Sequence, residues 1–113
     1  NISRAIDDMF KNEGNALPTP NLIISQVCKF YSIDDATLRG TLKNKGTAEA
    51  RQVAIYLIRQ LTNLSTPDIG KEVNKDHSTV LYSINKVEKA LENDDTNLQN
   101  HIRDITANIN SCL

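Results

Sequence analysis

The stretch STPDIGKEVNKDHSTV, residues 65–80, contains two helix starts close together. Ser65 and Asp68 have the spacing of a capping box, with Pro67 in the first helical turn. Asp76 is a capping residue in front of a second helix, and residues 74–75 between the helices are short enough for a tight turn. The sequence therefore predicts a helix-turn-helix unit made of residues 67–73 and 76–91.

The second helix of this unit has two distinct faces. Its apolar positions recur at helical spacing and predict a buried stripe of Val80, Ile84, Val87 and Leu91. The positions that point away from this stripe are His77, Ser78, Thr79, Tyr82 and Lys86. A recognition helix offers short polar groups of this kind to base edges from its N-terminal turn. The pattern alone supports a purely structural helical hairpin about as well as a DNA reader.

Helical periodicity extends over the rest of the chain. It predicts helices over residues 2–12, 20–31, 34–39 and 47–62, and from about residue 96, with a basic loop over residues 40–46. The expected fold is therefore all-α, a compact helical bundle with a helix-turn-helix and a preceding basic loop. The expected core comprises Ile24, Val27, Ala54, Leu57, Ile69, Val80, Ile84 and Val87.

Length and composition fit one globular domain. The chain has 113 residues, and no apolar run approaches the ~20 residues that a membrane span needs. No secretory signal is visible, and the first residue is Asn1 rather than Met, which indicates a fragment of a longer protein. Cys28 and Cys112 lack the spacing of zinc ligands with each other or with a histidine, so we expect two reduced thiols and no metal site.

Charge is distributed unevenly along a chain whose net charge is −1. Residues 39–89 contain nine bases and five acids, whereas the segments before and after are acidic. A basic middle is compatible with a nucleic-acid-binding face, although mixed charges also solvate ordinary helices.

Three stretches carry a resemblance to a known family. They are ARQVAIYLIR at residues 50–59, LTNLSTPDIG at residues 61–70 and KDHSTV at residues 75–80. Together they resemble the C-terminal, origin-binding domain of the bacterial DnaA replication initiators, over roughly residues 18–110. The turn before Lys75 has one residue fewer than is usual in that family and lacks its glycine. Lys75 replaces the commoner arginine, and the basic loop is less rich in arginine.

The resemblance implies sequence-specific binding of double-stranded DnaA boxes at the replication origin, for initiation and regulation of chromosomal replication. The recognition helix would lie in the major groove and the basic loop in the minor groove. The implied base contacts are Lys43, Lys45, Asp76, His77, Ser78, Thr79 and Val80, with Val80 packing against a thymine methyl. The implied phosphate contacts are Arg51, Gln52, Arg59, Thr66, Pro67, Lys75 and Lys86.

The same resemblance implies the setting in which the chain works. Residues 1–17 would be a linker helix from a preceding domain, and residues 18–113 the helix-turn-helix DNA-binding domain. The expected fragment is monomeric, non-enzymatic and free of cofactors, since ATP would bind an upstream domain. Its partner would be duplex DNA in the cytoplasm, in association with the nucleoid. Regulatory protein partners are not identified by the sequence.

Several roles have alternatives in the sequence. Asp76, Ser78 and Thr79 are also residues that simply favour a helix start, and the arginines at 51 and 59 are compatible with a solvated helix face. Asp76 and His77 as a catalytic pair or as metal ligands are disfavoured, because no second acid, nucleophile or ligand cluster accompanies them. Two other classes stay open, a transcriptional regulator built on the same motif and a protein-interaction module.

Overall fold

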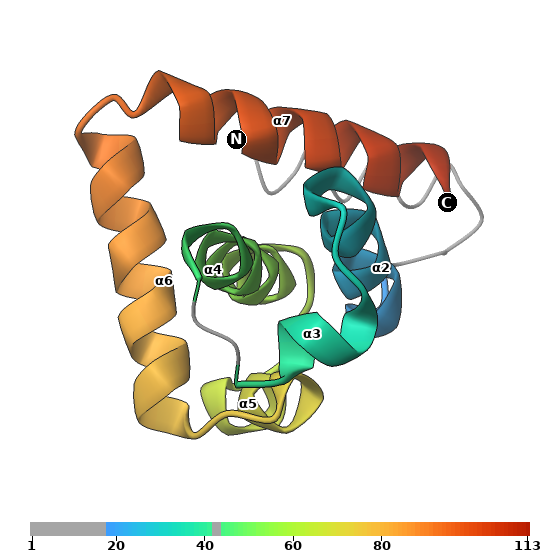
Figure 1. Cartoon of the computed structure of the whole chain (residues 1–113), viewed down its shortest axis with the longest axis vertical. Helices are drawn as coiled ribbons and strands as arrows, with labels where there is room; N and C mark the ends of the chain where they lie inside the picture. The colour runs from blue at the N-terminus through green and yellow to red at the C-terminus, as the bar shows by residue number, and fades with distance from the viewer. Residues whose placement is uncertain (1–17, 42–43) are drawn as a thin grey trace.

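The computed structural model describes residues 18–41 and 44–113, which form six helices and no strand (Figure 1). They are α2 (Pro20–Tyr31), α3 (Asp35–Arg39), α4 (Lys45–Leu61), α5 (Thr66–Val73), α6 (His77–Glu92) and α7 (Thr96–Ser111). The all-α prediction is confirmed. The helix expected over residues 2–12 lies outside the described residues, as does Lys43, and the division of the chain at residues 17 and 18 stays a prediction.

A polar side chain caps the start of every described helix. The capping residues, each accepting from a backbone N–H three residues later, are Thr19, Asp34, Asn44, Ser65, Asp76 and Asp95. Asn44 corrects one expectation, because its side chain accepts from the Thr47 N–H at 2.9 Å and starts α4 at Lys45 rather than at Thr47. Lys45 is therefore the first residue of a helix and not part of the loop.

Helix α4 is the centre of the bundle. Figure 1 shows it nearly end-on, with α6 on one side, α2 and α3 on the other, α5 beneath them and α7 across the opposite end. Its buried apolar residues are Ala50, Val53, Ala54, Ile55, Leu57 and Ile58. All eight residues expected in the core are buried, so the apolar periodicity identified the inward faces correctly.

Ile84 tests whether α6 is held by this core. Its side chain is only 7% exposed, so truncation to alanine should lower the free energy of unfolding by about 2–5 kcal/mol. Leu81 on the same helix is 40% exposed and provides a matched control, since Leu81→Ala should cost much less. Urea denaturation of both variants measures the difference. Equal losses would contradict the orientation of α6 described here.

Candidate nucleic-acid interface

The turn between α5 and α6 is closed by Asn74. This residue is left-handed, with φ 60° and ψ 45°, a conformation that asparagine tolerates better than most residues other than glycine. The following Lys75 N–H donates to the Gly70 carbonyl at 2.8 Å, which satisfies a carbonyl in the last turn of α5. The unit thus turns tightly without a glycine in the turn itself.

The first turn of α6 presents polar groups to solvent. The exposed Asp76 carboxylate accepts from the Thr79 N–H at 2.8 Å, and this backbone hydrogen bond holds the pKa of Asp76 below its usual range. His77 and Ser78 are exposed, and Thr79 is half-buried. A turn further on, Tyr82 is 59% exposed, with the Lys86 Nζ 5.7 Å from its ring centroid. The helix face predicted to point outward does so.

Two hollows flank this turn. One, of about 630 Å³, lies between α4 and α6 and reaches Gln52, Thr79 and Tyr82. The other, of about 390 Å³, lies on the α5 side and reaches Pro67 and His77. Because residues 74–76 line both hollows, they form a ridge between them. The start of α6 therefore lies between two surface hollows.

Val80 does not belong to this outward surface. Its side chain is completely buried among the core residues. The predicted contact between Val80 and a thymine methyl is therefore corrected, because in this structure no part of the side chain reaches the surface.

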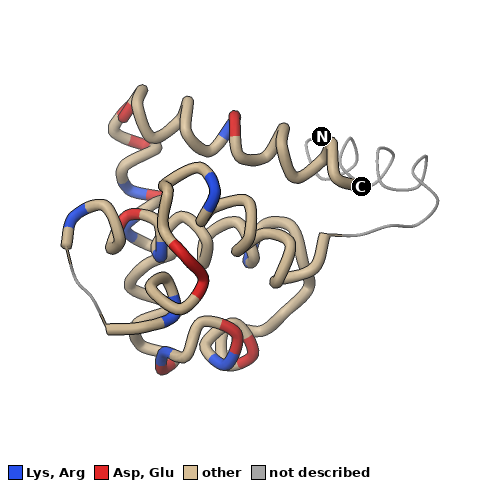
Figure 2. Tube along the Cα trace, turned by 45° about the vertical axis from the view of Figure 1, so that its right-hand side comes forward, with Lys and Arg blue, Asp and Glu red and all other residues tan. Residues whose placement is uncertain are grey.

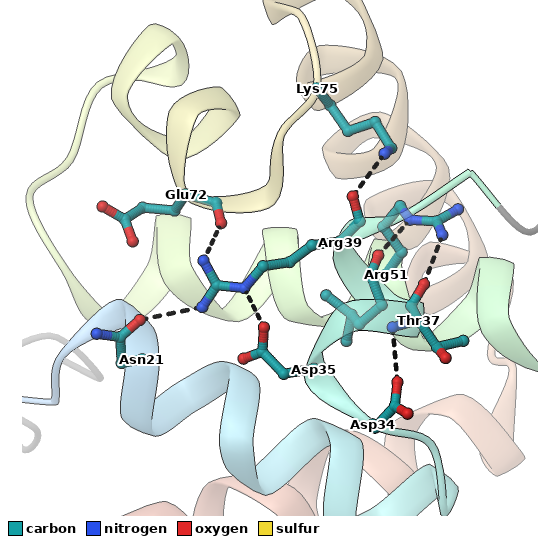
Figure 3. Close-up of polar contacts among 9 residues, drawn as sticks. Asn21, Asp34, Asp35, Thr37, Arg39, Arg51, Glu72 and Lys75 are labelled. Carbon is teal, nitrogen blue, oxygen red and sulfur yellow. Dashed lines mark hydrogen bonds and ion pairs between the residues drawn. The ribbon is translucent and has the colours of Figure 1, made fainter.

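Arg51 and Lys75, both expected to contact phosphates, are directed toward backbone carbonyls instead (Figure 3). Arg51 is 7% exposed, and its Nε donates to the Leu38 carbonyl at 2.7 Å. The Lys75 Nζ donates to the Gly40 carbonyl at 2.6 Å and to the Arg39 carbonyl at 3.2 Å. The structure thus uses both cations to hold the end of α3.

Other side chains expected to contact DNA lie at or near the surface: Lys45 as a base contact, and Gln52, Arg59 and Lys86 as phosphate contacts. Lys45, Gln52 and Lys86 line one hollow of about 350 Å³ between α4 and α6, together with the acidic Glu49 and Asp95. Arg59 is exposed near the other end of α4, about 21 Å from Lys45 along the helix, and its Nη1 donates to the Leu64 carbonyl at 3.2 Å. Candidate DNA contacts therefore lie toward both ends of α4, with the base contact Lys45 at its start and the phosphate contact Arg59 near its end.

The N-terminus of α5 adds backbone groups to this surface. Thr66 is half-buried and Pro67 exposed in its first turn, directly after the capping Ser65. Because Pro67 has no N–H and the Asp68 N–H donates to the Ser65 Oγ at 3.3 Å, the Thr66 N–H is the group of this turn that can meet an anion.

Acidic and basic residues are mixed over the molecule. Figure 2 shows both signs along the trace, and α5 alone carries Asp68, Lys71 and Glu72. Along the described part of this trace, acidic and basic positions therefore occur within the same elements. Charge by itself would not have identified this interface.

Two residues important to the interface had no role assigned from sequence. A Cβ on Gly70 would lie 2.5 Å from the Lys75 carbonyl oxygen, so α5 and the turn approach more closely than any side chain allows. Arg39 connects three helices through its guanidinium. Gly70 stood within a recognised motif and could have been singled out, whereas nothing in the sequence distinguishes Arg39 from a surface base.

Comparisons with known proteins agree with this geometry. A family model described as the bacterial dnaA protein helix-turn-helix matches residues 20–87. The chain is similar to proteins named chromosomal replication initiator protein DnaA. One, from Caldanaerobacter subterraneus subsp. tengcongensis, is 38% identical over 92 residues, which are 81% of this chain and 20% of that protein. Another, from Limosilactobacillus reuteri, is 43% identical over 90 residues, which are 79% of this chain and 20% of that protein. The chain thus spans about a fifth of the length of these curated relatives.

Proposed function

Because this chain belongs to the bacterial DnaA helix-turn-helix family, we propose that it binds double-stranded DnaA boxes at the replication origin, for initiation and regulation of chromosomal replication. The observation that carries the proposal is the exposed first turn of α6, which is capped by Asp76 and lies between two hollows. A turn of this kind fits the major groove, whose base edges are read by the N-terminal side chains of a recognition helix.

Each polar group of that turn has a chemical partner in the groove. The Asp76 carboxylate can accept from a cytosine amino group while it caps α6, and His77 can donate to a guanine acceptor. Ser78 and Thr79 can form hydrogen bonds, and the Thr79 methyl can pack against a thymine methyl. In this proposal Asp76, His77, Ser78 and Thr79 read the sequence, and Val80 supports them from the core.

The remaining contacts position the domain on the duplex. Lys45, at the exposed start of α4, and Lys43 would reach the adjacent minor groove, where A·T-rich sequence deepens the negative potential. Gln52, Arg59 and Lys86 would hold phosphates, as would the backbone N–H of Thr66 beside Pro67, which has no N–H of its own. These contacts contribute affinity without sequence information.

Substitution of Arg59 tests whether this residue contacts a phosphate, which positions the domain, or a base, which specifies the sequence. Arg59→Ala should weaken binding to a DnaA box and to a scrambled duplex alike, and should flatten the dependence of log K on log salt by about 0.9, because one phosphate contact is lost. The measurement is a titration of both duplexes at several salt concentrations. Arg103→Ala, an exposed arginine on α7, is the control and should change neither quantity. A changed sequence preference with an unchanged salt slope would argue against the phosphate contact.

The wider setting follows from the same premise. We expect this chain to act as a monomer without enzymatic activity and without a cofactor of its own, while ATP would bind elsewhere in the full-length protein. Its place would be the cytoplasm, on the nucleoid. None of the helices described in residues 18–41 and 44–113 is long and apolar enough to cross a membrane.

A mobility-shift titration with box and scrambled duplexes tests the proposal, and selection of binding sites from a random pool extends it. The proposal expects a clear preference for the box and recovery of box-like sequences. Selection of an unrelated sequence would favour a transcriptional regulator, and absence of DNA binding would favour a protein-interaction module.

A further inference from the structure

The last carbonyls of α3 are held by two cations that come from outside the helix. The Leu38 carbonyl accepts from the Arg51 Nε at 2.7 Å, and the Thr37 carbonyl accepts from its Nη2 at 3.3 Å. The Arg39 and Gly40 carbonyls both accept from the Lys75 Nζ. The last carbonyls of a five-residue helix have few backbone donors of their own; the Thr37 carbonyl accepts from the Gly40 N–H, and Arg51 of α4 and Lys75 of the turn supply the further donors.

Arg39, the last residue of α3, reaches out from the same segment and donates to groups on neighbouring helices (Figure 3). Its Nη1 donates to the Glu72 carbonyl, in the last turn of α5, at 2.6 Å. Its Nη2 donates to the Asn21 side chain of α2 at 3.0 Å, and its Nε pairs with Asp35 at 2.6 Å. The end of α3 and the region where α5 meets the turn are therefore tied together by Arg39 from one side and by Lys75 from the other.

The elements tied in this way lead directly into the proposed DNA contacts. Gly40 follows α3 on the path to Lys45 at the start of α4. Lys75 immediately precedes Asp76 and the first turn of α6. One lysine side chain thus connects the approach to the proposed minor-groove contact with the proposed major-groove reader.

We propose that Arg39, Arg51 and Lys75 act together as positioning residues, a cation brace that fixes the end of α3 and the start of α4 relative to α6. The inference rests on the proposed DNA binding. A rigid spacing matters because both elements have to meet one duplex at once, and freedom between them would be lost on binding at an entropic cost. The charged groups of the brace contact the protein's own carbonyls, the Asn21 side chain and the Asp35 carboxylate, so we expect the brace to support sequence discrimination rather than the salt-dependent affinity.

Lys75→Met tests the brace, since methionine keeps much of the side-chain length and removes the donors. We expect box binding to fall roughly tenfold, with binding to a scrambled duplex within about twofold of the unmodified chain and the salt slope unchanged. Lys75→Arg keeps donors for the carbonyls and should restore most of the box binding. Lys86→Met is the matched control, because this exposed lysine is a proposed phosphate contact, and it should weaken both duplexes and flatten the slope by about 0.9.

Amide hydrogen exchange provides a readout that does not depend on DNA. The Gly40 N–H donates to the Thr37 carbonyl at 3.2 Å, within the braced segment. In Lys75→Met this amide should exchange faster, while amides in the middle of α7 keep their rates and show that the chain stays folded. Unchanged exchange at Gly40 in Lys75→Met would overturn the brace, whether or not the unmodified chain prefers a box. Absence of a box preference in the unmodified chain would instead refute the proposed function.

The titrations can also overturn the inference. If Lys75→Met weakened both duplexes equally and flattened the slope as Lys86→Met does, Lys75 would be a phosphate contact. If it kept the full box preference of the unmodified chain, the brace would have no part in recognition.

Discussion

Gly70→Ala is expected to disrupt the helix-turn-helix more than alanine at either of the other described glycines, Gly40 and Gly46. The new Cβ would lie 2.5 Å from the Lys75 carbonyl oxygen, a backbone atom that no rotamer change can move. Overpacking of this kind costs about 1–3 kcal/mol of stability. Relief of this clash requires the Lys75 backbone to move, and Asp76 and the start of α6 would move with it.

Urea denaturation and box titration of Gly70→Ala measure the two consequences. We expect the free energy of unfolding to fall by about 1–3 kcal/mol and box binding to fall at least about tenfold, because the reading turn is displaced. Gly46→Ala is the matched control for stability, since its Cβ would meet only the Asn44 Oδ1 at 3.9 Å. A stable Gly70→Ala variant with full box affinity would show that the close approach of α5 to the turn is not required.

Local signals in the sequence were sufficient for the helix-turn-helix itself. Ser65 and Asp76 cap the helices that they were expected to cap, because a cap depends on residues only three positions apart. The apolar stripe of α6 was likewise predictable from its period for Val80, Ile84 and Val87, whereas Leu91 near the helix end is only partly buried. The start of α4 was predicted two residues late, at Thr47 instead of Lys45. Asn44 precedes the apolar pattern, and the pattern does not show which of the nearby polar residues caps the helix.

The direction of long cations was not predictable. Arg51 and Arg59 lie on one helix and have the same residue type, yet one is 7% exposed and the other lies on the surface. The difference arises because α3 packs over Arg51 and offers it the Leu38 and Thr37 carbonyls, a consequence of tertiary contacts. For Val80 the two predictions from sequence conflicted, a core position from its period and a base contact from the family resemblance, and the structure confirms the core position.

Loss of His77 or Thr79 is expected to have the largest effect on sequence discrimination. Both lie in the first turn of α6, and neither contributes to the buried stripe, so alanine should leave the fold nearly intact. The cap also survives in Thr79→Ala, because Asp76 accepts from the Thr79 backbone N–H. Each good base contact carries about 1–3 kcal/mol of discrimination, so each variant should lose about that much box binding.

Paired titrations of His77→Ala and Thr79→Ala, with box and scrambled duplexes at one salt concentration, test the central claim most directly. Circular dichroism shows that the helices persist, and Glu92→Ala, at the exposed far end of α6, is the control. The account predicts that box binding falls while scrambled binding barely changes, because the latter comes from phosphate contacts. If both variants stay folded and keep the full box-to-scrambled ratio of the unmodified chain, α6 does not read the sequence and the account is contradicted.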